Sequence, residues 1–163
     1  MAGKPAGAVD KPAEKIDLTG HIAASLNTAM ERERPAVVGV VAVDGTPSIS
    51  YRGSVHVYSQ DQVAIWVRKQ DTGLAADVTA NPAVSILYYD PAQGPDPAVG
   101  ARRIVIKGRA RVDASLNDVV YAGIPEVERE RDAERRGVAV IVDVDTVIGF
   151  GGTGPIKMSR DAG

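Results

Sequence analysis

The stretch AIWVRKQDTGLAADVTANP, residues 64–82, has side chains whose types and spacing suit the binding of an anion. An apolar run ends in Arg68 and Lys69, and a short polar turn follows. In that turn Asp71 or Thr72 is positioned to cap a new helix. Free N–H groups at a helix N-terminus, beside guanidinium and hydroxyl groups, form a phosphate site. The same residues also fit an ordinary capped helix with cations on the surface.

Other motifs suggest chemistry that their surroundings do not support. GFGGTG, residues 149–154, matches a dinucleotide fingerprint, but no βαβ unit surrounds it and Pro155 follows at once. We interpret it as a flexible strand exit. Ser54 and His56 share a strand face, as a nucleophile and its base would, but no glycine-framed elbow surrounds Ser54. Cations spaced two apart on one strand fit either an exposed sheet face or a groove for an anion: Lys107, Arg109 and Arg111.

The run EVERERDAERR, residues 126–136, mixes charges of both signs. Asp132 and Arg136 are four residues apart, which places them on the same side of a helix. A pattern of this kind is typical of a solvated helix face.

Composition limits the possible classes of function. The chain has 163 residues, a formal net charge of -2 and no cysteine. This charge argues against nucleic acid or an acidic membrane as partner. The lack of cysteine excludes disulfides, a thiolate nucleophile and a zinc-thiolate site, and with only two histidines we predict no metal site. No apolar run approaches the roughly 18 residues of a membrane span, and the N-terminus lacks the apolar core of a signal peptide. We therefore predict a cytoplasmic protein.

The elements that must position these residues follow from the hydrophobic periodicity. Helices are predicted over 17–34, after residue 72, from residue 115 and over 125–136. The predicted strands cover 36–43, 48–59, 63–69, 83–90, 102–114 and 138–151. The first three strands have short links and predict a meander. Six strands mostly joined by hairpins predict a mainly β (α+β) protein, a closed or nearly closed antiparallel barrel with flanking helices.

The chain is predicted to form one domain between two tails. Residues 1–15 are small, polar and broken by proline, so we expect a disordered N-terminal tail. The domain covers residues 16–152, and residues 153–163 are predicted to be a C-terminal tail.

The order of these segments resembles the pyridoxamine 5′-phosphate oxidase-like, flavin-binding split-barrel superfamily. The resemblance runs from about residue 17 to residue 150 and rests on the order and spacing of four stretches. These are GTPSISYRGSVHVY, AIWVRKQDTGL, ANPAVSILYYDP and RRIVIKGRARV. It implies a six-stranded antiparallel split β-barrel that forms a homodimer, with one flavin per subunit held between the two chains.

The resemblance also implies which residues contact the cofactor. The ring is expected along the second strand near Gly53, where a missing side chain allows close approach. Tyr51 and His56 stand where the oxidases have arginine and lysine, so we expect a flavin site without that particular reaction. The implied contacts are Tyr51, Arg52, Gly53, Ser54, His56, Trp66, Val67, Arg68, Thr72, Gly73 and Arg103. Arg103 stands where the family has a glutamine.

The cofactor implied by the resemblance is flavin mononucleotide. The 8-hydroxy-5-deazaflavin coenzyme is the alternative, because Lys69, Arg102 and Arg103 suit its long acidic tail. We expect an oxidoreductase that passes hydride or electrons to a small organic substrate or to oxygen. A non-catalytic flavin-binding protein and a structural dimer with an emptied site are the competing interpretations. The catalytic residue is unknown, with Tyr51 and Tyr88 the nearest candidates for a proton donor.

Overall fold

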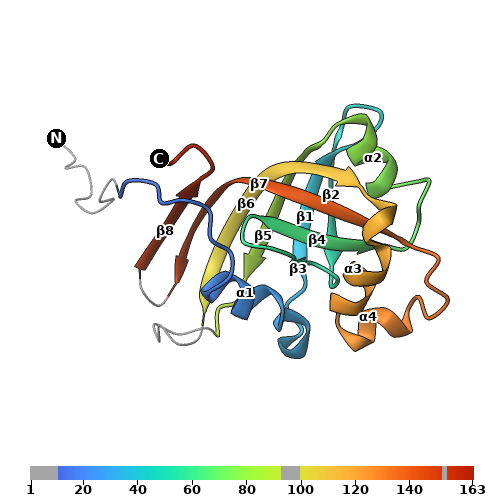
Figure 1. The fold of residues 1–163 in the computed structure, drawn as a ribbon, viewed down its shortest axis with the longest axis horizontal. Helices are drawn as coiled ribbons and strands as arrows, with labels where there is room; N and C mark the ends of the chain where they lie inside the picture. The colour runs from blue at the N-terminus through green and yellow to red at the C-terminus, as the bar shows by residue number, and fades with distance from the viewer. Residues whose placement is uncertain (1–10, 93–99, 152–153) are drawn as a thin grey trace.

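The protein is a curled antiparallel sheet with short helices on its outside (Figure 1). The computed structural model describes residues 11–92, 100–151 and 154–163. The strands in these ranges are β1 (Ala36–Val41), β2 (Pro47–Arg52), β3 (His56–Val57), β4 (Gln62–Val67), β5 (Ala83–Tyr89), β6 (Ala101–Val112), β7 (Val138–Gly151) and β8 (Gly154–Ser159). The α-helices are α1 (His21–Leu26), α2 (Leu74–Ala80), α3 (Asn117–Gly123) and α4 (Glu126–Glu130), and the 3-10 helices are η1 (Ala29–Arg32) and η3 (Ala114–Leu116). Within the described ranges, no helix is both long and apolar enough to cross a membrane.

The order of the strands explains how the sheet closes. The strands follow one another in the order β2-β1-β5-β6-β7-β4-β3, and β8 pairs with β7. The two ends of this path, β2 and β3, are consecutive in the chain and only Gly53, Ser54 and Val55 separate them. Three residues span roughly 10 Å, so the two edge strands are brought together. We call residues 53–55 the seam.

The predicted split-barrel class is confirmed, but the strand count of six is too low. The strand predicted over 48–59 is two strands, because the chain turns at Gly53 and Ser54. The pairings of the predicted meander are present, because β1 pairs with β2 and β3 pairs with β4, but β2 and β3 lie at opposite ends of the strand order.

The predicted C-terminal tail is also wrong in part, because residues 154–159 form β8. This strand pairs with β7 from Thr146↔Ser159 to Gly151↔Gly154. Glu14, within the predicted N-terminal tail, forms a parallel bridge to Met158. Residues 1–10 lie outside the described residues, as do residues 152 and 153 of the GFGGTG motif. Pro155 is tolerated because β8 is an outer strand, where a missing N–H leaves no central ladder bond unmade.

Two apolar clusters hold the fold together. The larger lies inside the barrel, where alternate valines of β7 from Val138 to Val144 are buried, as their spacing predicted. The smaller lies on the opposite face of β4 and β7, under α3, and is formed by Ala64, Trp66, Val120, Tyr121, Ile124, Ala139 and Ile141. β4 and the first half of β7 are therefore buried on both faces. This packing on both sides holds the two strands in place.

The helix predicted over 17–34 is shorter than expected. It breaks into α1 and η1, and Ile22 and Leu26 are buried as predicted. Asn27 follows α1, and its side-chain oxygen accepts the Val57 N–H of β3 at 2.8 Å. Glu33 then adopts a left-handed conformation with φ of 55°. Both features turn the chain into β1 before a long helix can form.

A buried ion pair attaches η1 to the end of β5. Asp90, with 1% of its surface exposed, accepts a bond from Arg32 Nε at 2.9 Å and from the Ala92 N–H at 3.0 Å. Arg32 also donates to Tyr88 Oη at 2.8 Å. Burial raises the pKa of Asp90, but the bonds from Arg32 and Ala92 more than offset this and hold the pKa below its usual value.

Asp90→Asn is expected to lower the free energy of unfolding at pH 7 by about 2 kcal/mol, because Arg32 loses its buried counter-charge. A lowered pKa gives stability that is complete above the unfolded value of about 3.9 and is lost as the pH falls through the folded value. The difference between the variant and the wild type should therefore be complete at pH 7 and smaller at pH 3, which lies below the unfolded value. Urea unfolding at both pH values measures this, with Asp145→Asn as control, because Asp145 also pairs with an arginine, Arg160, but its side chain is 46% exposed. An equal difference at both pH values would contradict the assignment.

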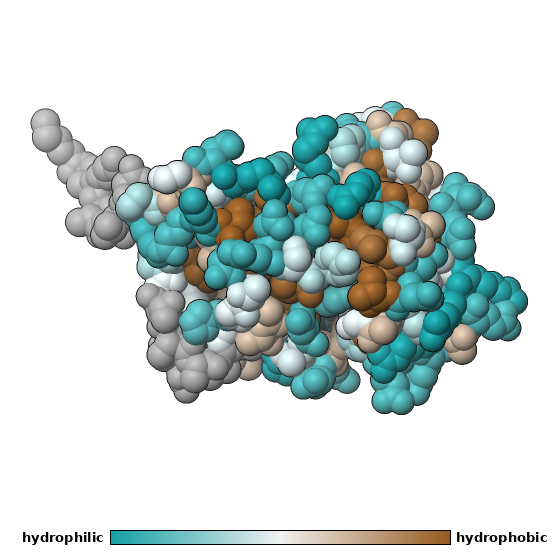
Figure 2. Space-filling view, viewed as in Figure 1, coloured by the Kyte–Doolittle hydropathy of each residue, from teal (hydrophilic) through white to brown (hydrophobic). Residues whose placement is uncertain are grey.

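The outer face of the sheet carries a row of apolar side chains. The register aligns one residue from each of five strands, and Tyr51, Leu87 and Ile148 in this row are exposed. We call this row the outer apolar row, and its members are Tyr51, Val37, Leu87, Val105 and Ile148. Figure 2 shows apolar residues reaching the surface over β6 and β7 among hydrophilic ones. Exposed apolar patches of this kind mark contact surfaces.

Candidate functional site

Two arginines come together beside the seam. Arg52 is the last residue of β2, and Arg68 directly follows β4. The pKa of Arg52 is lowered by its partial burial and by the positive charge of Arg68, while the charge of Glu128 raises it. The end of the edge strand β2 and the end of β4, the neighbour of the other edge strand β3, therefore place two like charges close together. Such a pair is stabilised by an anion between them.

The α4 segment supplies the acidic groups that face these arginines. Glu128 lies within α4 and is buried, and its Oε1 accepts a bond from Arg131 Nη1 at 2.5 Å. Asp132 follows α4, and the charge of Arg68 acts on it. The site therefore has cations from β2, β4 and the α4 segment. We call Arg52, Arg68 and Arg131 the arginine cluster.

Asp132 organises the turn after α4. Its carboxylate accepts the Trp66 Nε1–H at 2.8 Å, the Arg136 N–H at 3.0 Å and the Gly137 N–H at 2.9 Å. Burial raises the pKa of Asp132, but these bonds and the nearby Arg68 together lower it below its usual value. The prediction of a solvated face for this run is therefore wrong at Asp132, which is buried.

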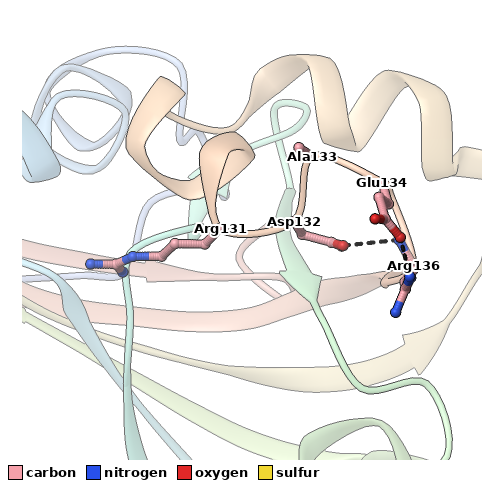
Figure 3. A pocket seen from close by; sticks show the side chains of 5 residues that line it. All are labelled: Arg131, Asp132, Ala133, Glu134 and Arg136. Carbon is pink, nitrogen blue, oxygen red and sulfur yellow. Dashed lines mark hydrogen bonds and ion pairs between the residues drawn. The ribbon is translucent and has the colours of Figure 1, made fainter.

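A cavity of about 310 Å³ opens at this turn, lined by Arg131, Asp132, Ala133, Glu134 and Arg136 (Figure 3). Asp132 points towards Arg136, while the Arg131 side chain extends in the opposite direction (Figure 3). The Arg136 side chain pairs with Glu134. Arginines therefore lie at both ends of the cavity.

Four of the residues predicted to contact the cofactor are buried in this chain. Ser54 Oγ donates to the Trp66 carbonyl at 2.9 Å and accepts the Trp66 N–H at 3.2 Å. Trp66 packs edge-on against Tyr121, and Val67 belongs to the inner core. These bonds fasten the seam to β4. Cofactor contacts from Ser54, His56, Trp66 and Val67 stay predictions.

His56 does not form a nucleophile–base pair with Ser54. Its Nδ1 lies 2.9 Å from the backbone carbonyl oxygen of Ser54, and its Nε2 faces Gly123. Burial lowers the pKa of His56, although the bond to the Ser54 carbonyl raises it. The imidazole ring is therefore neutral near pH 7, and its contacts are with the backbone of neighbouring segments.

The remaining predicted residues are exposed at separate places. Tyr51 lies in the outer apolar row with 76% of its surface exposed, and Arg103 is exposed on β6. Thr72 is exposed, and the expected side-chain cap from Asp71 or Thr72 is not made. Gly73 is the N-cap of α2 instead, with φ of 59° and no side-chain hydrogen bond. A left-handed N-cap favours glycine, which explains the residue at this position.

Tyr88 is excluded as an exposed proton donor. It is completely buried in the barrel, where it accepts a bond from Arg32 and donates to Asp90 at 3.4 Å. Tyr51 is exposed, and its role as a proton donor stays a prediction.

The region around Gly53 fits the phosphate end of a flavin better than the ring. A Cβ placed on Gly53 would lie 2.6 Å from Glu128 Oε1 and 2.9 Å from Met30 Sδ. The space over the glycine is therefore filled by two flexible side chains. A ring at Gly53 requires both to move, whereas a phosphate between Arg52 and Arg68 meets two cations already in place.

The sequence matches no protein-family model and no curated protein. Solved structures do match the fold. A protein from Clostridium acetobutylicum, related to general stress protein 26 and of the pyridoxinephosphate oxidase family, superposes with a TM-score of 0.57 at 12% identity, covering 84% of this chain and 95% of that chain. The fold is that of the pyridoxamine 5′-phosphate oxidase-like split barrels.

Two further solved structures with this fold have names that do not mention pyridoxamine phosphate oxidase. An F420 reductase matches with a TM-score of 0.53 at 16% identity over 74% of this chain and 94% of its own. PhzG from Burkholderia lata, solved with tetrahydrophenazine-1-carboxylic acid, matches with a TM-score of 0.53 at 16% identity over 84% of this chain and 78% of its own. The described arrangement of strands is shared by split barrels that carry different names.

The α4 contribution to the site was missed by the sequence analysis. Glu128 and Asp132 are four residues apart, so their shared face was visible in the sequence. Their contacts with the site, however, join distant parts of the chain: Asp132 bonds to Trp66, 66 positions away, and Glu128 lies over Gly53. Local spacing carries no signal for such contacts.

Proposed function

We propose that this protein is a flavin-dependent oxidoreductase that binds flavin mononucleotide. The observation that carries the proposal is the convergence of Arg52 and Arg68 at the seam of a split barrel. A dianionic phosphate offsets the repulsion between these two guanidinium groups and accepts bonds from both. When bound, the flavin would supply the hydride and electron chemistry.

The role of this chain's own residues would be to bind the cofactor and to orient it. Arg52 and Arg68 would hold the phosphate, and Arg131 adds a third cation beside Glu128. Trp66, fixed by Asp132 and Tyr121, makes the wall of the site rigid. The small apolar cluster under α3 excludes water from behind the arginines.

A deazaflavin reductase is the second candidate. Exposed cations suit the long acidic tail of an 8-hydroxy-5-deazaflavin, and a solved structure with this fold is named F420 reductase. The cations in question are Lys69, Arg102 and Arg103. Titration of the protein with each coenzyme, followed by cofactor fluorescence, separates the two candidates. Binding of neither coenzyme would contradict both and favour the emptied-site dimer.

Turnover separates an enzyme from a non-catalytic flavin-binding protein. The loaded protein is mixed with reduced nicotinamide, and nicotinamide absorbance is followed. Steady consumption supports the oxidoreductase. Tight flavin binding without consumption favours a binding protein instead. A cytoplasmic location stays a prediction.

We further propose that two copies associate through the outer apolar row. Leu87 lies near the middle of this row and is 41% exposed. Leu87→Glu introduces a charge into an apolar contact, so the variant should elute from a sizing column as a monomer while the wild type elutes as a dimer. The monomeric variant should also lose flavin binding, because the resemblance predicts a site shared between two chains.

A matched control is Val43→Glu, since Val43 is exposed in the β1–β2 hairpin, outside the outer apolar row. This variant should remain a dimer. A monomeric Leu87→Glu that binds flavin at full strength would overturn the shared site.

A further inference from the structure

A buried carboxylate occupies the space above the seam. Glu128 Oε1 lies 2.6 Å from the position that a Cβ of Gly53 would take. The Glu128 side chain is only 11% exposed. Burying a carboxylate is costly unless opposite charges surround it.

The opposite charges are those of the arginine cluster. Arg131 donates to Glu128 Oε1 at 2.5 Å, and the Glu128 charge raises the pKa of Arg52. Arg68 in turn lowers the pKa of Arg52. Glu128 is thus an anion next to Arg131 and Arg52, and Arg52 in turn lies near Arg68, which is the electrostatic position that a bound phosphate needs.

We propose that Glu128 is an internal counter-anion that the ligand's phosphate displaces from the arginine cluster. The inference rests on the proposed function in one respect, that this cluster takes a phosphate. Displacement of Glu128 also removes the carboxylate from the space over Gly53, where the resemblance places the ring. Movement of Glu128 therefore frees the anion site and removes one of the two side chains over Gly53, the other being Met30.

The test uses Glu128→Gln, which keeps the size of the side chain and removes its charge. Inorganic phosphate is titrated into the purified full chain by calorimetry. The variant should bind phosphate about tenfold more tightly than the wild type, the equivalent of one charge-assisted hydrogen bond. Emission of Trp66, the only tryptophan, gives a second readout because its indole is bonded to Asp132 beside Arg68.

The matched control is Glu130→Gln, an exposed glutamate on the same helix, which should leave phosphate affinity unchanged. Glu128→Ala removes the whole carboxylate and should act in the same direction as Glu128→Gln. Unchanged or weaker phosphate binding in both Glu128 variants overturns the inference, as does a lack of phosphate binding by all of the proteins. If both variants gain phosphate affinity but none binds flavin mononucleotide, the inference stands and the flavin proposal fails.

Discussion

Arg52→Ala is expected to weaken the binding of flavin mononucleotide roughly 10- to 100-fold and to leave riboflavin binding unchanged. Riboflavin lacks the phosphate, so it loses nothing when a phosphate ligand is removed. The partial burial of Arg52 strengthens the effect, because a charge-assisted bond is stronger where water is partly excluded. Quenching of flavin fluorescence measures both affinities. Arg68→Ala should behave in the same way.

The control for charge alone is Arg109→Ala. Arg109 is exposed on β6 and projects from the outer face of the sheet, so its loss removes one positive charge from the protein without touching the seam. It should change neither affinity by more than about twofold, since an exposed charge at that distance is screened by salt. Equal losses of riboflavin and flavin mononucleotide in Arg52→Ala would mean that Arg52 supports the fold rather than the phosphate.

Asp132→Ala is expected to lower the free energy of unfolding by about 3 kcal/mol at pH 7, because three N–H donors lose a charged acceptor at once. Two of these donors, those of Trp66 and Gly137, make their bonds in buried surroundings. Urea unfolding followed by the emission of Trp66 measures the loss. The pKa of Asp132 is lowered, so the stability that it gives is present above about pH 4 and is lost as the pH falls through the folded value.

A matched control for Asp132→Ala is Glu134→Ala, two residues along the same turn. Glu134 is exposed and pairs with Arg136 on the surface, so its loss should cost less than about 0.5 kcal/mol. Similar losses in the two variants would show that the carboxylate of Asp132 has no special place in the turn.

Much of the sheet was predictable from residue type and spacing. The alternation of valine and aspartate from Val142 to Asp145 predicted β7, because a half-buried strand has a period of two. A similar alternation exists in β8, where Ile156 and Met158 pack against the core, but the sequence analysis assigned these residues to the C-terminal tail. The split of the predicted 48–59 strand was not predictable, since the turn at Gly53 depends on the closing of the sheet.

The site was predictable only in part, for a physical reason. Arg68 was found because a strand end followed by cations is a local pattern, whereas Arg52 was named only through the family resemblance. The burial of Ser54, His56 and Trp66 depends on α3 and the α4 segment packing over β4, which is a contact between distant parts of the chain. Glu128 was interpreted as a solvated charge for the same reason. Charge periodicity shows which residues share a helix face but not what that face meets.

The seam has a mechanical consequence for the whole barrel. In the part of the chain that the structure describes, β2 pairs with no strand except β1, and β3 pairs with no strand except β4, so the strands on either side of residues 53–55 are the two edges of one continuous sheet. Arg52 lies at the end of one edge strand and Arg68 lies beside the other. A ligand that binds both arginines therefore holds the two edges together. The binding energy of this ligand then opposes opening of the barrel as well as its own dissociation. A contact at the rim therefore raises the thermal stability of the whole sheet.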